Sequence, residues 1–117
     1  MNEVVEYVDS SGRSAFGAWF DGLDARAAAI VATALSRLAD GNTSNVASIG
    51  SGAAEVKIDR GPGYRIYFGW DGRTLVVLLG GGTKRRQQRD IAAALTAWND
   101  YKARKPASRS RAIPRKR

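Results

Sequence analysis

The chain of 117 residues contains no cysteine and no histidine. Without cysteine it can form neither disulfides nor thiolate metal sites, and it has no thiol nucleophile. Without histidine it lacks the commonest general base and the commonest metal ligand of proteins. The two absences exclude zinc hydrolases and Ser-His-Asp enzymes, and we expect the protein to use no metal and no other cofactor.

Long apolar segments are also absent. No run approaches the roughly 18–20 residues that cross a membrane, and the N-terminal residues MNEVVEYVD are acidic, unlike a signal peptide. We therefore expect no membrane association and a cytoplasmic location. The chain has the size of one domain, and its 44% hydrophobic content is ordinary for a globular protein.

Positive charge is concentrated at the C-terminus. Eight of the 19 Lys and Arg residues lie between Lys102 and Arg117, which leaves eleven basic against eleven acidic residues in the rest of the chain. We expect a folded domain over residues 1–102 and a basic, disordered tail over residues 103–117. Such a tail is either a solvated terminus or an arm that neutralises phosphates of a nucleic acid.

Hydrophobic periodicity predicts helices at both ends of the domain. A first helix places Phe16, Trp19, Phe20 and Leu23 on one face and closes at Gly22. A second helix begins at the N-cap Asp24 and stops at Gly41. The last helix covers Thr83 to Arg104.

Alternating residues and turn signals predict the strands. They cover Glu3–Val8, Glu55–Asp59, Tyr64–Trp70 and Thr74–Leu79, with a loop over residues 42–54, a turn at 60–63 and a two-residue hairpin signal at Asp71-Gly72. The strand over 74–79 is apolar throughout, so we expect both of its faces to be covered, and Gly80-Gly81-Gly82 to end it. The order β-α-α-β-β-β-α predicts an α+β domain with an antiparallel-dominated sheet and the helices on one face.

Two familiar kinds of site are not supported. Gly80-Gly81-Gly82-Thr83-Lys84 lacks the spacing of a phosphate loop. The carboxylates Asp59, Asp71 and Asp90 fall at a strand end, a turn and a helix start, where such residues serve structure. Paired carboxylates for acid-base catalysis do not stand out.

The informative residues are cationic. Lys57, Arg60 and Arg65 lie on or beside two neighbouring strands, and Lys84 and Arg85 follow the third. In an antiparallel meander these groups converge at one end of the sheet. Converging cations indicate an anion such as a phosphodiester, because guanidinium groups stabilise a pentavalent phosphate. The alternative is a solvated sheet face carrying unrelated charges.

Several segments resemble one family of bacterial toxins. Residues 55–68 (EVKIDRGPGYRIYF), Leu75–Leu79, Lys84 and residues 88–92 (QRDIA) are similar to the RelE/ParE superfamily of type II toxins, in the HigB-like branch of phage-derived addiction-module killer proteins. The most specific pieces are the GPGYR motif and the GG-x-K-x-x-Q-x-R-D-I segment. The resemblance covers roughly residues 3–103.

The resemblance implies a small antiparallel sheet with helices and a function as a toxin. Such proteins are mRNA interferases that inhibit translation by cleaving mRNA in the ribosomal A site, without a metal. The 2′-OH of the RNA attacks the adjacent phosphate and leaves a 2′,3′-cyclic end. A cognate helix-turn-helix antitoxin neutralises the toxin in a hetero-oligomeric complex, usually with two copies of each chain.

The resemblance also implies roles for single residues. Arg65 matches the central catalytic arginine, and Lys84 and Arg85 match the Lys-Arg pair after the last strand. Lys57 matches a strand lysine after a shift of one residue and would help to activate the 2′-OH or protonate the leaving oxygen. We further expect substrate contacts from neighbouring basic and aromatic side chains: Arg60, Tyr64, Tyr67, Arg86 and Arg89.

One family feature is missing. RelE-type proteins carry a tyrosine in the last element that stacks on the substrate, and the matching position here is near Ile91, with no aromatic closer than Trp98. We expect Tyr64 and Tyr67 to supply stacking from the sheet instead. Trp19 and Trp70 are either exposed anchors for the antitoxin or core residues.

Two other functions stay open. A ParE-like protein poisons DNA gyrase through a binding surface on the same fold, which fold alone does not distinguish. A non-catalytic RNA-binding or ribosome-binding domain would depend mainly on the basic tail. The converging cations favour the nuclease, because a gyrase poison needs no phosphate-cleaving site.

Overall fold

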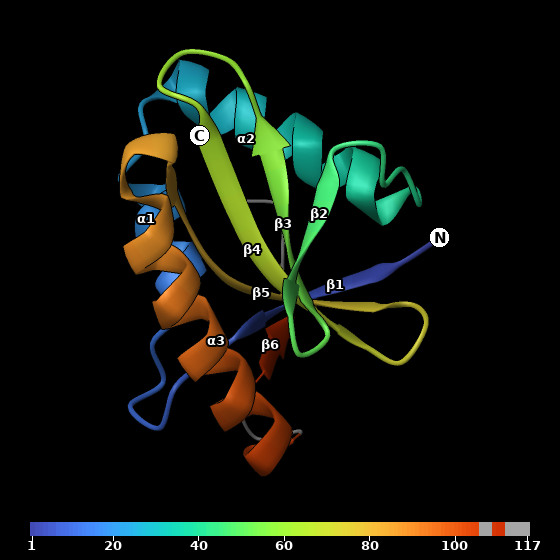
Figure 1. Cartoon of the computed structure of the whole chain (residues 1–117). Coiled ribbons are helices and arrows are strands. Elements are labelled where there is room, and N and C mark those ends of the chain that lie inside the picture. The colour runs from blue at the N-terminus through green and yellow to red at the C-terminus, as the bar shows by residue number, and fades with distance from the viewer. Residues whose placement is uncertain (106–108, 112–117) are drawn as a thin grey trace.

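A six-stranded sheet with three α-helices forms the molecule (Figure 1). The computed structural model describes residues 1–105 and 109–111. The elements are β1 (Glu3–Tyr7), α1 (Ala15–Asp21), α2 (Ala25–Ala39), β2 (Val46–Gly50), β3 (Ala53–Ile58), β4 (Tyr64–Asp71), β5 (Leu75–Thr83), a short 3-10 helix η1 (Lys84–Arg86), α3 (Gln87–Arg104) and β6 (Arg109–Arg111).

The sheet has the order β2-β3-β4-β5-β1-β6. All neighbouring strands are antiparallel except β1 and β5, which run parallel. The long connection between them through α1, α2 and the β2–β4 meander makes parallel pairing possible. The predicted α+β class with an antiparallel-dominated sheet is therefore confirmed. Val76 to Leu79 of β5 are all buried, as expected for a strand covered on both faces.

The prediction that the helices cover one face of the sheet is wrong. Phe16, Phe20 and Val31 of α1 and α2 pack on one face, against Ile66 and Phe68 of β4. The other face carries a second core, in which Trp98 and Tyr101 of α3 pack against Tyr67 and Val77. Alternation along β4 and β5 sends neighbouring apolar residues to opposite faces, so each face needs its own cover.

Local signals place the ends of α1 and α2 correctly. Ser14 caps α1 by accepting from the Gly17 amide, and Asp24 accepts from the Ala27 amide at 2.8 Å as the predicted N-cap of α2. Gly41 follows the C-cap of α2 with φ +93° and donates to the Leu38 carbonyl at 3.0 Å. Only glycine adopts this left-handed conformation without strain.

Two strand boundaries differ from the sequence prediction. Part of the expected loop over residues 42–54 is strand β2, which pairs with β3 as an edge strand of half-exposed residues without a strong alternating pattern. Strand β5 also continues through Gly80-Gly81-Gly82 to Thr83 instead of stopping there. The hairpin after Asp71 is confirmed, but its loop spans three residues, 72–74, since Asp71 pairs with Leu75.

The glycines within the strands accommodate side chains from the helices. A Cβ on Gly81 would collide with the Trp19 ring of α1, and one on Gly69 with the Trp98 ring of α3. A Cβ on Gly82 would lie 3.0 Å from the Asp90 Cγ. The glycine run of β5 therefore does not end the strand but lets α1 and α3 approach it closely.

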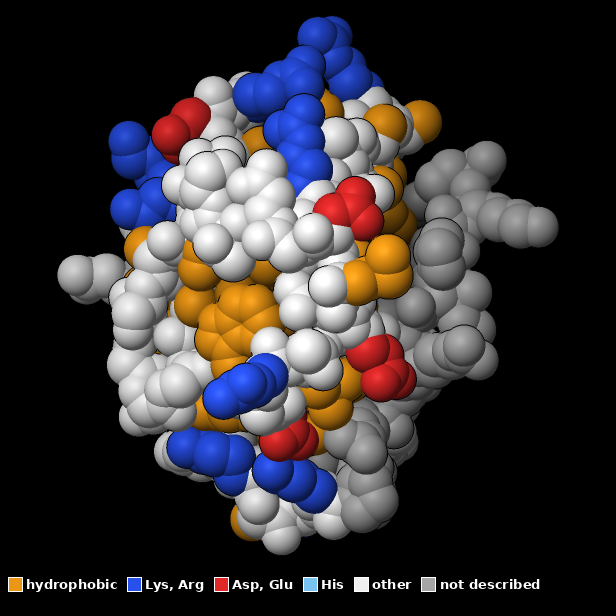
Figure 2. Space-filling model, turned by 90° about the vertical axis from the view of Figure 1, so that its right-hand side faces the viewer, with side chains coloured by type: hydrophobic (Ala, Val, Ile, Leu, Met, Phe, Trp, Pro, Cys, Tyr) orange, Lys and Arg blue, Asp and Glu red, His pale blue; other side chains and the backbone are white. Residues whose placement is uncertain are grey.

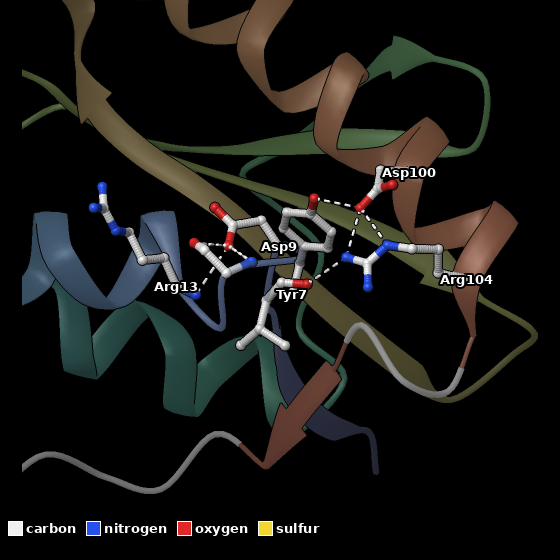
Figure 3. Close-up of polar contacts among 7 residues, drawn as sticks. Tyr7, Asp9, Arg13, Asp100 and Arg104 are labelled. Carbon is white, nitrogen blue, oxygen red and sulfur yellow. Dashed lines mark hydrogen bonds and ion pairs between the residues drawn. The ribbon is translucent and has the colours of Figure 1, made fainter.

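Polar contacts fasten the C-terminal half of α3 to the sheet. The Tyr7 hydroxyl of β1 donates to Asp100 at 2.6 Å, and Arg104 donates to Asp100 at 2.7 and 2.9 Å and to the Val8 carbonyl at 2.9 Å (Figure 3). The Arg104 and Tyr7 hydrogen bonds hold the pKa of Asp100 below its ordinary value. Burial, followed by the Asp100 hydrogen bond, raises the pKa of Tyr7.

The expected boundary at residue 102 falls inside α3, which continues to Arg104. Residues 109–111 of the expected disordered tail pair as β6 with β1, through Val5–Arg111 and Tyr7–Arg109. The remaining tail residues, 106–108 and 112–117, lie outside the described residues.

Candidate functional site

Arg65 lies at the centre of the predicted cationic site. It pairs across strands with Lys57 of β3 and Gly82 of β5, so Lys57 and Arg65 share the face that α3 covers. The Arg65 side chain is 4% exposed. Its Nη1 donates to the Tyr64 carbonyl at 3.0 Å and lies 3.5 Å from Asp59 Oδ1. Its buried Nε has no hydrogen-bond partner among the described residues.

The turn before β4 brings Lys84 to Arg65. The Lys84 amide donates to the Gly63 carbonyl at 2.7 Å. A Cβ on Gly63 would lie 3.1 Å from Lys84 Cβ and 3.7 Å from Arg65 Nη1, so both side chains pass over this glycine. Gly63 has φ +77°, which also favours glycine. We call Lys57, Arg65 and Lys84 the Arg65 cluster.

The other predicted cations lie around this cluster. Arg85 and Arg86 of η1 and Arg89 of α3 are exposed and, with Lys84, Gln87 and Gln88, line an open depression. Arg60 lines a groove between α2 and the end of β3, together with Arg37, Lys57 and Asp59.

Basic side chains form more than one surface patch. Figure 2 shows one face of the molecule, on which Lys and Arg side chains gather toward the top and toward the bottom. Hydrophobic and uncharged side chains, with some Asp and Glu side chains, lie between them.

Tyr67 does not fit its expected role. Its side chain is fully buried beneath α3, so it cannot stack on an RNA base from the sheet surface. Burial, reinforced by the charges of Glu55 and Asp90, raises the pKa of Tyr67 well above its ordinary range. Tyr64 is half-buried and packs against the core under α1 and α2, with its hydroxyl near Gly61.

A buried polar cluster beneath the start of α3 escaped the sequence analysis. Glu55 is 4% exposed and accepts two hydrogen bonds from Gln87 Nε2, at 2.8 and 3.0 Å. It pairs across strands with Tyr67, whose buried hydroxyl has no partner among the described residues. Alternation of Glu55 and Lys57 with apolar residues indicated a solvated face, and only the position of α3 shows that Glu55 is covered.

The aromatic residues of α3 pack in the core between this helix and the sheet. Trp98 donates from Nε1 to the Ser51 carbonyl at 2.6 Å and stacks on Tyr101 with ring centroids 5.4 Å apart. Ile91 is half-buried and packs against the core under α3. Neither Trp98 nor Ile91 therefore replaces the substrate-stacking tyrosine that the resemblance leads one to expect.

The two candidate anchor tryptophans belong to the core. Trp19 covers Gly81, and Trp70 meets Phe68 edge-to-face at a centroid distance of 5.2 Å. Both are half-buried and pack against the core under α1 and α2. Packing within the chain accounts for both residues without a partner.

The described part of the chain holds neither a cluster of metal ligands nor a membrane-spanning helix. Over residues 1–105 and 109–111, three or more His, Asp or Glu side chains nowhere gather as they would to hold a metal ion. Within the same residues, each helix is too short or too polar to cross a membrane.

The comparisons with known proteins give a relative but no function. No family model matches the chain. An uncharacterised protein of Haemophilus influenzae (strain ATCC 51907 / DSM 11121 / KW20 / Rd) is 39% identical over 80 residues, which cover 68% of this chain and 81% of the relative. The chain therefore belongs to the same family as this uncharacterised Haemophilus influenzae protein.

Proposed function

We propose that this protein is the toxin of a type II toxin–antitoxin system, similar to the RelE/ParE superfamily and its HigB-like branch. In this proposal it is a metal-independent endoribonuclease that cleaves mRNA on the ribosome and thereby inhibits translation and growth. Its place of action is then the cytoplasm, and a helix-turn-helix antitoxin neutralises it in a hetero-oligomeric complex.

The observation that carries the proposal is the Arg65 cluster. Lys57 of β3 and Arg65 of β4 are opposite each other in the sheet, and Lys84 lies with the Arg65 guanidinium over Gly63. The buried Arg65 Nε has no hydrogen-bond partner among the described residues. Like charges held close together are unfavourable unless an anion compensates them. Asp59 is the one carboxylate within 4 Å of Arg65 among the described residues, and at 80% exposure it compensates weakly.

A phosphodiester supplies the missing charge. Attack of the 2′-OH places extra negative charge on the phosphate oxygens, and a guanidinium already held in position stabilises that charge. Arg65 takes this role, Arg85 reaches the same phosphate from η1, and Lys84 protonates the leaving 5′ oxygen. Lys57, opposite Arg65, contributes positive charge beside the reacting ribose.

The test is 5′-end mapping of a reporter mRNA in a bacterial translation extract, with and without ribosomes. We expect cuts that depend on ribosomes, and a loss of about 10²–10³-fold in rate for Arg65→Ala. Arg65 is buried, so Arg85→Ala, which changes an exposed side chain, is the second variant. Arg73→Ala is the control, because Arg73 is an exposed arginine in the loop at the other end of β4.

Intact mRNA with folded wild-type protein would refute the nuclease proposal. Linear DNA produced by purified gyrase in the presence of the protein would then indicate a gyrase poison. Cleavage that persists in both Arg65→Ala and Arg85→Ala would keep the nuclease but move its site elsewhere.

A further inference from the structure

The Arg65 cluster contains no group suited to accept the proton of the attacking 2′-OH. Arginine does not lose its proton in proteins. Lysine becomes a base where burial drives off its proton, but Lys57 and Lys84 are both exposed. Tyr67 lies on the same face but is fully buried, and the chain has no histidine. A 2′-OH nucleophile nevertheless needs a base within hydrogen-bond reach.

Asp59 lies beside the Arg65 guanidinium, where a base for the 2′-OH is needed. It follows β3 directly, and the turn over residues 59–63 directs its Oδ1 to within 3.5 Å of Arg65 Nη1. Its side chain is 80% exposed, whereas that of Arg65 is 4% exposed, so the carboxylate marks the side from which solvent and substrate approach the guanidinium. A phosphate that meets Nη1 therefore lies beside the Asp59 carboxylate.

We propose that Asp59 is the general base of the RNA cleavage. The inference rests on the proposed function. It gives a catalytic role to Asp59, which the sequence analysis interpreted as a structural residue at the end of a strand. One carboxylate oxygen takes the proton as the O2′–H bond breaks and the O2′–P bond forms. The P–O5′ bond then breaks, the leaving O5′ takes a proton from the Lys84 ammonium, and the 2′,3′-cyclic phosphate remains. Solvent afterwards removes the proton from Asp59 and returns one to Lys84.

The charges around Asp59 suit this role. Arg65 of β4 faces it directly, Arg60 follows it in the turn, and Lys57 precedes it on β3. Lys84 and the Arg65 guanidinium both lie over Gly63. These cations attract a phosphate to the place where the Asp59 carboxylate lies. The weak, exposed contact with Arg65 lets the carboxylate turn toward the ribose at little cost.

The experiment compares wild type with Asp59→Asn, Asp59→Glu and the control Asp40→Asn, which changes an exposed carboxylate at the end of α2. Cleavage rates on saturating ribosome–mRNA complexes are measured from pH 6.5 to 8.5, together with ribosome binding and thermal unfolding. We expect Asp59→Asn to cleave about 10²–10⁴-fold more slowly, with unchanged binding and unfolding. Asp59→Glu should recover part of the rate, and Asp40→Asn should match wild type.

The pH profile separates a base from a residue that only positions Arg65. The wild-type rate should change little with pH, because the Asp59 carboxylate, and not hydroxide, takes the proton. The rate of Asp59→Asn should rise by about tenfold per pH unit, since hydroxide must then replace the missing base. A flat profile for Asp59→Asn, or a rate within threefold of wild type, would overturn the assignment while the nuclease stands. An inactive wild type would overturn both.

Discussion

Replacing Gly69 by alanine is expected to destabilise the fold through a collision with Trp98. The new Cβ would lie 2.7 Å from Trp98 Cδ2 and closer still to two other ring atoms. The ring has no room to retreat, because it is 3% exposed, donates to the Ser51 carbonyl at 2.6 Å and stacks on Tyr101. Overpacking of this kind costs about 1–3 kcal/mol in the free energy of unfolding.

The measurement is urea unfolding followed by circular dichroism, with thermal unfolding alongside. A loss of 1 kcal/mol lowers the midpoint of a domain of this size by roughly 4–8 °C. Gly80→Ala is the matched control. Gly80 lies in β5, the strand next to β4, and a Cβ on it would have no heavy atom within 4 Å apart from its chain neighbours. Such a change should be neutral or stabilising by a few tenths of a kcal/mol, up to about 1 kcal/mol.

A double-mutant cycle tests the cause. In a Trp98→Leu background the collision is gone, so Gly69→Ala should cost far less than in the wild type. Equal stability of Gly69→Ala and Gly80→Ala, or an undiminished penalty in the Trp98→Leu background, would show that Trp98 does not occupy the space above Gly69.

Three further predictions concern α3 and its surroundings. Gln87→Leu should cost about 1–3 kcal/mol, because it leaves the buried Glu55 carboxylate without its donor; urea unfolding beside the exposed control Gln88→Leu measures this, and equal losses would contradict it. The lowered pKa of Asp100 means that its contacts stabilise the fold above the unfolded pKa of about 3.9 and that this contribution disappears as the pH falls through the folded value. Unfolding free energies of wild type and Asp100→Asn should therefore differ at pH 7 and approach each other as the pH falls below about 3.9, whereas a constant difference would refute the assignment. Arg85→Gln should weaken binding of single-stranded RNA and lower the slope of log affinity against log salt by about one, as expected for one lost phosphate contact; fluorescence anisotropy measures it, and a slope equal to that of wild type would exclude Arg85 from phosphate binding.

Much of the fold depends on local chemistry and was therefore predictable. The N-cap Asp24, the left-handed Gly41 and the turn before Tyr64 act within a few residues of chain. The apolar strand Leu75–Leu79 shows its burial on both faces directly in its composition. Strand β2 was missed because an edge strand of small and polar residues has little periodicity, and its pairing with β3 stabilises it instead.

The candidate site could be predicted only in part. The approach of Lys57, Arg65 and Lys84 followed from strand order, because antiparallel pairing places residues of known register opposite one another. The position of Asp59 beside Arg65 did not follow, since it depends on the shape of the turn over residues 59–63.

The sequence by itself determined the three helices, the strands β1, β3, β4 and β5, the caps and turns, the excess of cations around β3–β5 and the lack of histidine and cysteine, because these depend on residue identity and short-range conformation. Only the tertiary structure decided that α3 covers the face carrying Glu55, Arg65 and Tyr67, and that glycines in β4 and β5 make room for Trp98 and Trp19. The physical reason is that burial depends on which distant surface packs against a strand. Alternation along the strand gives the same pattern whether a polar face meets water or the start of a helix.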